Sequence, residues 1–70
     1  MKPFIYQKRI ALPTPAQAKD LREGDQFKTK ANPGVAKFTR VQKDGTILAT
    51  YGSGTLRLSP SYPIYKLIFC

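Results

Sequence analysis

Tight-turn signals recur through the second half of this chain and divide it into short segments that are rich in strand-forming residues. The clearest signals are Asn32-Pro33-Gly34, Asp44-Gly45 and Gly52-Ser53-Gly54, which combine residues suited to the special backbone angles of β-turns and hairpins. They recur at a spacing of about ten residues, as strands do in small barrels and rolls. We therefore expect a mainly β fold.

The segments between the turns have strand-like patterns. Residues 26–30 alternate, with Phe27 and Thr29 on one side and lysines on the other. Residues 35–43 do not keep their apolar side chains on one parity, which predicts a bulge or bend. In residues 55–59, Leu56 and Leu58 are expected to point inward, and residues 64–69 are expected to form the last strand.

The first third of the chain predicts one strand followed by one short helix. Residues 3–10 are aromatic and β-branched and are expected to be a strand. Thr14, Pro15 and Gln17 fit an N-cap, a first helical proline and a capping box. These signals predict a helix near residues 15–22, which Gly24 would end. Ala18 and Leu21 would plug one end of the sheet.

The length of 70 residues indicates a single domain over residues 1–70. We expect an N-terminal strand or extension over residues 1–13, followed over residues 14–70 by the helix and a barrel core. Cys70 is the only cysteine, so no disulfide forms within the chain and a cytoplasmic location is expected. Lys8 and Arg9 interrupt the N-terminal apolar stretch, which argues against a secretory signal.

Three of the four acidic residues lie close together, at Asp20, Glu23 and Asp25. We interpret them as turn residues, because short acids can accept hydrogen bonds from nearby backbone N–H groups around Gly24. The alternative is a metal site. It is disfavoured because calcium requires six to eight oxygen ligands from a defined loop pattern.

The chain lacks the residues that most catalytic sites require. It has no histidine and a single cysteine, so His-based catalysis and cysteine or histidine zinc sites are excluded. The glycines of residues 51–56 lack the lysine and the helix of a phosphate-binding loop. We therefore expect a protein that is not an enzyme and that uses no metal or other cofactor.

Two stretches resemble the SH3-like small β-barrels. Leu21-Arg22-Glu23-Gly24-Asp25-Gln26-Phe27 resembles the lead-in to their first long strand, and residues 58–68 resemble their last strand with its preceding proline and tyrosine. The resemblance covers residues 21–68 and implies a strongly bent five-stranded barrel whose loops bind proteins or nucleic acids. KOW-like modules and stand-alone phage- or plasmid-type modules are the branches that it suggests.

The charge points to a polyanion as partner. The net charge is +8 and the isoelectric point is about 10.0, which is the electrostatic footprint of a nucleic-acid-binding domain. We predict a DNA- or RNA-binding regulator that contacts the phosphate backbone. The predicted contacts are Lys28, Lys30, Lys37, Arg40, Lys43 and Arg57.

Several alternatives stay open. The lysines can instead form a solvated face, and Tyr51 and Tyr62 can either stack on bases or pack in the core. The second functional hypothesis is a protein-interaction adaptor or inhibitor, encoded by a phage or plasmid, that docks on a larger complex such as the transcription machinery. It would use an exposed sheet edge such as residues 3–10. No membrane partner is expected, since no stretch approaches eighteen apolar residues.

Overall fold

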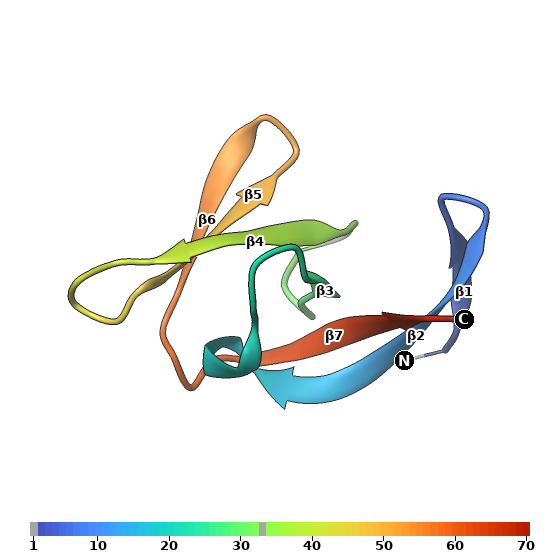
Figure 1. Ribbon diagram of the computed structural model, residues 1–70, viewed down its shortest axis with the longest axis horizontal. Helices are drawn as coiled ribbons and strands as arrows, with labels where there is room; N and C mark the ends of the chain where they lie inside the picture. Colours follow the sequence, from blue (N-terminus) through green and yellow to red (C-terminus); the bar gives the residue numbers. More distant parts are fainter. Residues whose placement is uncertain (1, 33) are drawn as a thin grey trace.

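The computed structural model describes residues 2–32 and 34–70 and is mainly β, as the sequence predicts. The described residues form one antiparallel sheet of seven strands in the order β1-β2-β7-β3-β4-β5-β6 (Figure 1). The sheet is open, with β1 and β6 as its edges in the described part of the chain. The elements are β1 (Phe4–Tyr6), β2 (Arg9–Gln17), the 3-10 turn η1 (Ala18–Asp20), β3 (Gln26–Lys28), β4 (Ala36–Val41), β5 (Ile47–Tyr51), β6 (Gly54–Leu58) and β7 (Pro63–Phe69).

The core lies against one face of the sheet, which we call the inner face. Cross-strand partners share a face of a sheet, and so do alternate residues of a strand. Phe27 and Ile64 are the largest fully buried side chains, and Ala18 and Leu21 close the core beside η1 as predicted. The buried members of the core cluster are Ala18, Leu21, Phe27, Ala36, Ile47, Ala49, Leu58 and Ile64.

Two predicted hairpin turns are confirmed. Between β4 and β5, the Asp44 carboxylate accepts the N–H of Thr46 at 2.9 Å, and Gly45 takes a φ of +91°. Between β5 and β6, Gly52 takes a φ of +60° and the ladder closes at Tyr51 and Gly54. The third predicted turn includes Pro33, which lies outside the described residues.

The predicted strand over residues 3–10 is wrong, because it is a hairpin. Gln7 and Lys8 have φ angles of 51° and 64° and reverse the chain, so Tyr6 pairs with Arg9. Non-glycine residues rarely adopt these angles, and Gln-Lys is not a turn signal. The sequence therefore gave no reason to place a turn there.

The predicted helix near residues 15–22 is reduced to one 3-10 turn at Ala18–Asp20. Thr14 and Pro15 lie in β2, which pairs with β7 up to Gln17 and Pro63. The Ala18 N–H donates to the Tyr62 carbonyl and the Cys70 N–H donates to the Ile10 carbonyl. These bonds show that the backbone N–H and C=O groups of the even-numbered residues of β2 point toward β7. The backbone nitrogens of Pro13 and Pro15, which carry no hydrogen, therefore point away from β7. A strand tolerates proline there, because no ladder hydrogen bond is lost.

The acidic turn has the structural role that was predicted. The Asp25 carboxylate accepts the N–H of Arg22 at 2.9 Å, and Gly24 between them takes a φ of +89°. Asp25 also forms an ion pair with Lys66 on β7 at 3.3 Å. The Asp20 carboxylate accepts the N–H of Gln17 at 3.0 Å and so ties η1 to the end of β2.

Candidate nucleic-acid interface

The face opposite the core, which we call the outer face, carries several of the predicted cations. Lys37 on β4 lies across from Thr50, which in turn lies across from Thr55. In the next row, Arg40 lies across from Leu48.

Leu48 also faces Arg57 on its other side. Three cations from β4 and β6 therefore share one surface of three neighbouring strands.

A bulge in β4 makes this arrangement possible. Positions 37 and 40 differ in parity, so a regular strand would place their side chains on opposite faces. The register shifts between Phe38 and Arg40, and an extra residue of this kind re-aims the side chains that follow it. The hydroxyls of Thr39 and Thr50 lie 3.1 Å apart. The Thr39 side chain therefore lies beside Thr50, which is the cross-strand partner of Lys37 on the outer face. The bulge predicted for residues 35–43 is thus confirmed, and it brings Lys37 and Arg40 together.

Leu48 shows how the two arginines are held. It is only 7% exposed, yet it does not belong to the core cluster, because it points to the outer face. The sheet register places Arg40 and Arg57 on either side of it. Long basic side chains cover apolar surface with their stems and leave the charged head in water. The stems of Arg40 and Arg57 can therefore cover Leu48 while their charged heads stay in solvent, since both arginines are exposed.

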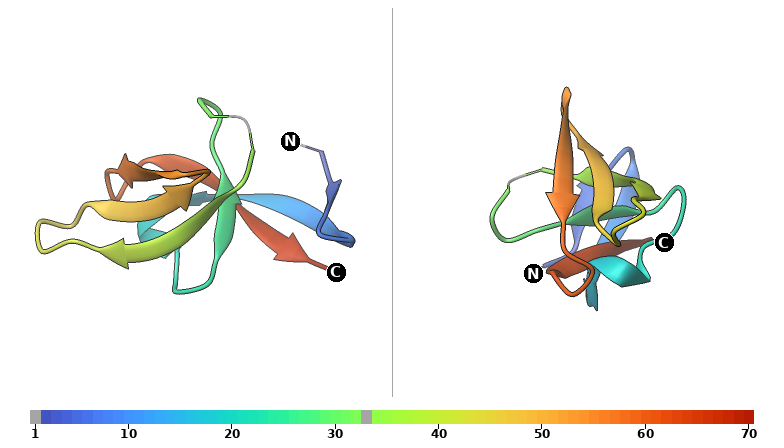
Figure 2. Two further views of the ribbon diagram at one scale, coloured as in Figure 1. Left: turned by 90° about the horizontal axis from the view of Figure 1, so that it is seen from above. Right: turned by 90° about the vertical axis from the view of Figure 1, so that its left-hand side faces the viewer.

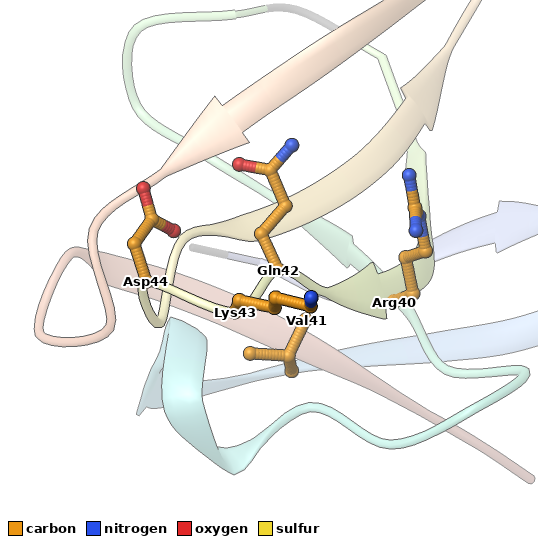
Figure 3. Close-up of a pocket in the computed structure, with 5 residues that line it drawn as sticks. All are labelled: Arg40, Val41, Gln42, Lys43 and Asp44. Atoms are coloured by element: carbon orange, nitrogen blue, oxygen red, sulfur yellow. The ribbon is translucent and has the colours of Figure 1, made fainter.

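The β4–β5 turn extends this surface at the end of the molecule opposite the chain termini (Figure 1). A shallow hollow here is lined by Arg40, Val41, Gln42, Lys43 and Asp44. In Figure 3, Arg40, Gln42 and Asp44 extend to one side of this segment and Val41 to the other.

Asp44 is the acidic residue of this region. The backbone N–H of Thr46 lowers the pKa of the Asp44 carboxyl, with smaller contributions from the Thr46 side chain and from the charge of Arg57. The Asp44 carboxylate is thus hydrogen-bonded within its own turn. Its negative charge offsets only one of the neighbouring cations.

The remaining predicted contacts lie elsewhere. Lys28 is half-buried, and its Nζ sits 4.9 Å from the centre of the Phe4 ring, in a cation–π contact. Lys30 is exposed in the segment after β3. Tyr51 and Tyr62 are partly buried and pack against the core cluster. Of these two interpretations of the tyrosines, core packing is therefore the one that the structure supports.

Sequence reasoning missed a cluster of rings and cations at the other end of the outer face. The Tyr6 and Phe69 rings stack with centroids 6.2 Å apart, and Phe4 meets Tyr6 edge-on at 6.5 Å. The Arg9 guanidinium lies 4.2 Å from the centre of the Phe69 ring. The equal parity of Phe4 and Tyr6 was visible in the sequence, but the hairpin that adds Arg9 was not.

The three clustered acids do not come together as a metal site. Asp20 and Asp25 are engaged with backbone N–H groups and with Lys66, as described above. Among residues 2–32 and 34–70, no three cysteine, aspartate or glutamate side chains are arranged to hold a metal ion. In the same residues, no helix combines the length and the apolar character that crossing a membrane requires.

Comparisons with known proteins give no relative. No protein-family model matches this sequence, and neither the curated proteins nor the solved structures yield a match. A functional assignment therefore rests on the residues and geometry described above.

Proposed function

We propose that this protein is a small, non-enzymatic nucleic-acid-binding module that contacts the phosphate backbone through the outer face of β4–β6. The observation that carries the proposal is the convergence of Lys37, Arg40 and Arg57 on one surface of three adjacent strands. Binding would release counterions from the nucleic acid, so affinity would depend strongly on salt.

The composition of this surface suits phosphates better than bases. Thr39, Thr50 and Thr55 lie among the cations, and hydroxyl groups donate hydrogen bonds to phosphate oxygens. In the described residues, β4–β6 place no aromatic side chain on the outer face, because Phe38 and Tyr51 lie on the inner one; the rings of Phe4, Tyr6 and Phe69 lie at the other end of the sheet. We expect modest sequence preference, because phosphate contacts position a protein without reading bases.

An SH3-like roll formed by β3–β7 is part of the proposal. These five strands are contiguous in the sheet, and the last of them, β7, pairs with the first, β3. Their span, from Gln26 to Phe69, agrees closely with residues 21–68, which carry the resemblance. A regulatory role in the cytoplasm belongs to the same proposal.

The test is fluorescence anisotropy with labelled single-stranded DNA, duplex DNA and RNA at about 50 and 200 mM salt, where phosphate contacts become visible. The outer-face variant carries Lys37→Gln, Arg40→Gln and Arg57→Gln. We expect its slope of log affinity against log salt to be shallower by roughly 2 to 3, since each lost phosphate contact removes about 0.7 to 0.9.

A matched control separates a defined surface from general positive charge. Lys2→Gln, Lys19→Gln and Arg22→Gln also remove three positive charges, but from exposed positions outside β4–β6. This control should bind nearly as tightly as the native chain. Equal weakening in both variants would show that only net charge matters. Absence of binding at the lower salt for all three nucleic acids would refute the proposal.

A specific observation also favours the alternative of a protein-interaction adaptor. Three of the four exposed large apolar side chains in the described residues, those of Ile5, Ile10 and Ile68, belong to β1, β2 and β7, and the fourth, Val41, lies on β4. The β1 hairpin lies at the end of the sheet away from the β4–β5 turn (Figure 1). A docking function at that end is compatible with nucleic-acid binding on β4–β6, because the two surfaces are separate.

A further inference from the structure

Three isoleucines form an exposed apolar patch beside the N-terminal hairpin. Ile5 is 70% exposed, Ile10 is 47% exposed and Ile68 is 45% exposed. Ile5 and Ile10 are direct cross-strand partners, and Ile68 lies across from Leu12, two residues along β2 from Ile10. All three therefore share one face of the sheet. We call Ile5, Ile10 and Ile68 the isoleucine patch.

The patch is a continuation of the inner face beyond the core. Ile64 and Ile68 have the same parity on β7 and therefore share a face, and Ile64 is only 1% exposed in the core. Ile64 is buried in the core cluster by residues of η1 and of β3–β6. The isoleucine patch lies farther along the same face, where these elements do not cover the sheet. An antiparallel sheet that faces water normally carries polar residues there. Exposed apolar surface of this kind commonly marks an interaction site.

The patch adjoins an open sheet edge. Among the described residues, β1 pairs with β2 alone. In a two-residue hairpin, Tyr6 and Arg9 exchange backbone hydrogen bonds, and the next pair, Ile5 and Ile10, does not. The backbone N–H and C=O of Ile5 therefore point to the open edge. Ile5 thus offers both its side chain and its backbone to an incoming strand.

The charge around this edge selects the kind of partner. Residues 1–19 and 63–70 contain no aspartate or glutamate, and Lys2, Lys8 and Arg9 flank β1. A second copy of this chain would bring these cations against their equivalents, with no acid to compensate. An extended segment that alternates apolar and acidic residues would match both the patch and its charges.

We propose that the β1 edge and the isoleucine patch bind an extended acidic–apolar segment of a partner protein, which adds to the sheet as a strand beside β1. Phe4–Tyr6 of β1 already pair with Arg9–Ala11 of β2 in the same chain, so donation of β1 to another sheet is the less suitable mode. Acceptance of a strand leaves the hairpin intact. Main-chain hydrogen bonds then supply affinity, and the alternating side chains supply specificity.

The test uses the full chain and a fluorescein-labelled synthetic peptide in which isoleucine alternates with glutamate. A second peptide replaces glutamate with lysine. We expect the acidic peptide to bind and the basic one not to bind. Amide chemical-shift changes should centre on Phe4–Tyr6, and the outer-face variant should retain its affinity, since β4–β6 is not involved.

The decisive variant is Ile5→Thr with Ile68→Thr, which keeps β-branched side chains at exposed positions and removes apolar surface. It should weaken peptide binding about tenfold or more. Val41→Thr is the matched control, because Val41 is 52% exposed but lies on β4. It should leave the affinity unchanged.

Three outcomes would overturn the proposal. The first is equal affinity of the native chain and the isoleucine variant for the acidic peptide, or no binding at low salt. The second is concentration-dependent dimerisation in sedimentation velocity that the isoleucine variant abolishes, which would make a second copy the occupant. The third is binding to phosphatidylserine vesicles but not to the peptide, lost in the same variant, which would indicate a lipid surface.

Discussion

The inner face of the sheet is buried at one end of the sheet and exposed at the other. At the core end, formed by η1 and β3–β6, the inner face is covered and its large residues, such as Phe27 and Ile47, are almost fully buried. At the hairpin end, formed by β1, Arg9–Leu12 and Leu67–Cys70, the inner face carries the isoleucine patch and is open to solvent. Figure 2 shows the hairpin projecting from the rolled part of the sheet. Burial at the core end maintains the fold, and exposure at the hairpin end leaves apolar surface free for binding.

The outer face differs between the same two ends in the opposite sense. At the core end it is cationic and open. At the hairpin end the rings of Phe4, Tyr6 and Phe69 share this face with Ala11 and Leu67, which are buried but lie outside the core cluster. Lys28 on β3 reaches the Phe4 ring on β1, two strands beyond its neighbour β7. The sheet therefore curls toward its outer face at the hairpin end and forms a second, smaller apolar cluster there.

The largest effect should come from removing a ring at the core end. Phe27→Ala empties a site with 0% exposure, and such changes cost about 3 to 5 kcal/mol, a large part of the stability of a small domain. Phe69→Ala, at a half-buried ring, should cost less, roughly 1 to 2 kcal/mol. Urea unfolding followed by circular dichroism measures both. Equal losses would mean that the hairpin end belongs to the main core.

The turns at the two ends provide the next contrast. Gly45, in the β4–β5 turn, has a φ of +91°, and a Cβ there would meet Pro60 at an acceptable 3.6 Å. Gly45→Ala should therefore cost about 1 to 2 kcal/mol, through backbone strain rather than through a clash. The free energy of unfolding measures this cost. A cost near zero would indicate that the turn can change its geometry without loss.

At the hairpin end, a substitution to glycine should increase the stability of the chain. Lys8 has a φ of 64° although it is not glycine, so Lys8→Gly should stabilise the chain by about 1 kcal/mol relative to Lys8→Ala. The alanine variant controls for the lost charge and keeps the strain. Unfolding midpoints compare the two variants. If alanine is as stable as glycine, the β1–β2 turn does not keep its positive angles in solution.

The smallest effect concerns pH at the β4–β5 turn. The hydrogen bond from the Thr46 N–H holds the pKa of Asp44 below its ordinary value of 3.8. The unfolded chain therefore binds this proton more readily, so the contribution of Asp44 to stability is present above pH 3.8 and is lost as the pH falls through the lowered pKa. Asp44→Asn should remove this part of the acid sensitivity, which unfolding curves across that range would reveal. An unchanged pH dependence would contradict the role of Asp44.

Local signals predicted the core end well. The hairpin at Asp44-Gly45 and the inward side chains of Leu56 and Leu58 followed from turn chemistry and alternation. The hairpin end was predicted poorly, because Gln7 and Lys8 take angles that their side chains do not favour. The helix signal of Thr14 and Pro15 was overridden by the long pairing of β2 with β7.

The candidate site was predicted in part for the same physical reasons. Lys37, Arg40 and Arg57, which the sequence singles out by their charge, share one face of the sheet. Lys28 was included because of its charge, but its position over the Phe4 ring depends on contacts between residues far apart in the chain. The isoleucine patch was hidden because exposed and buried isoleucines look alike in a sequence.

By itself, the sequence determined the β class, the positions of the later turns and the excess of positive charge, because these depend on single residues and on their immediate neighbours. Only the tertiary structure decided which basic side chains lie on the same face of the sheet. The bulge in β4 moves Arg40 to the face of Lys37, and the ladders bring Arg57 beside them. The tertiary structure also decided which isoleucines remain uncovered, because burial depends on how far the sheet curls around its core.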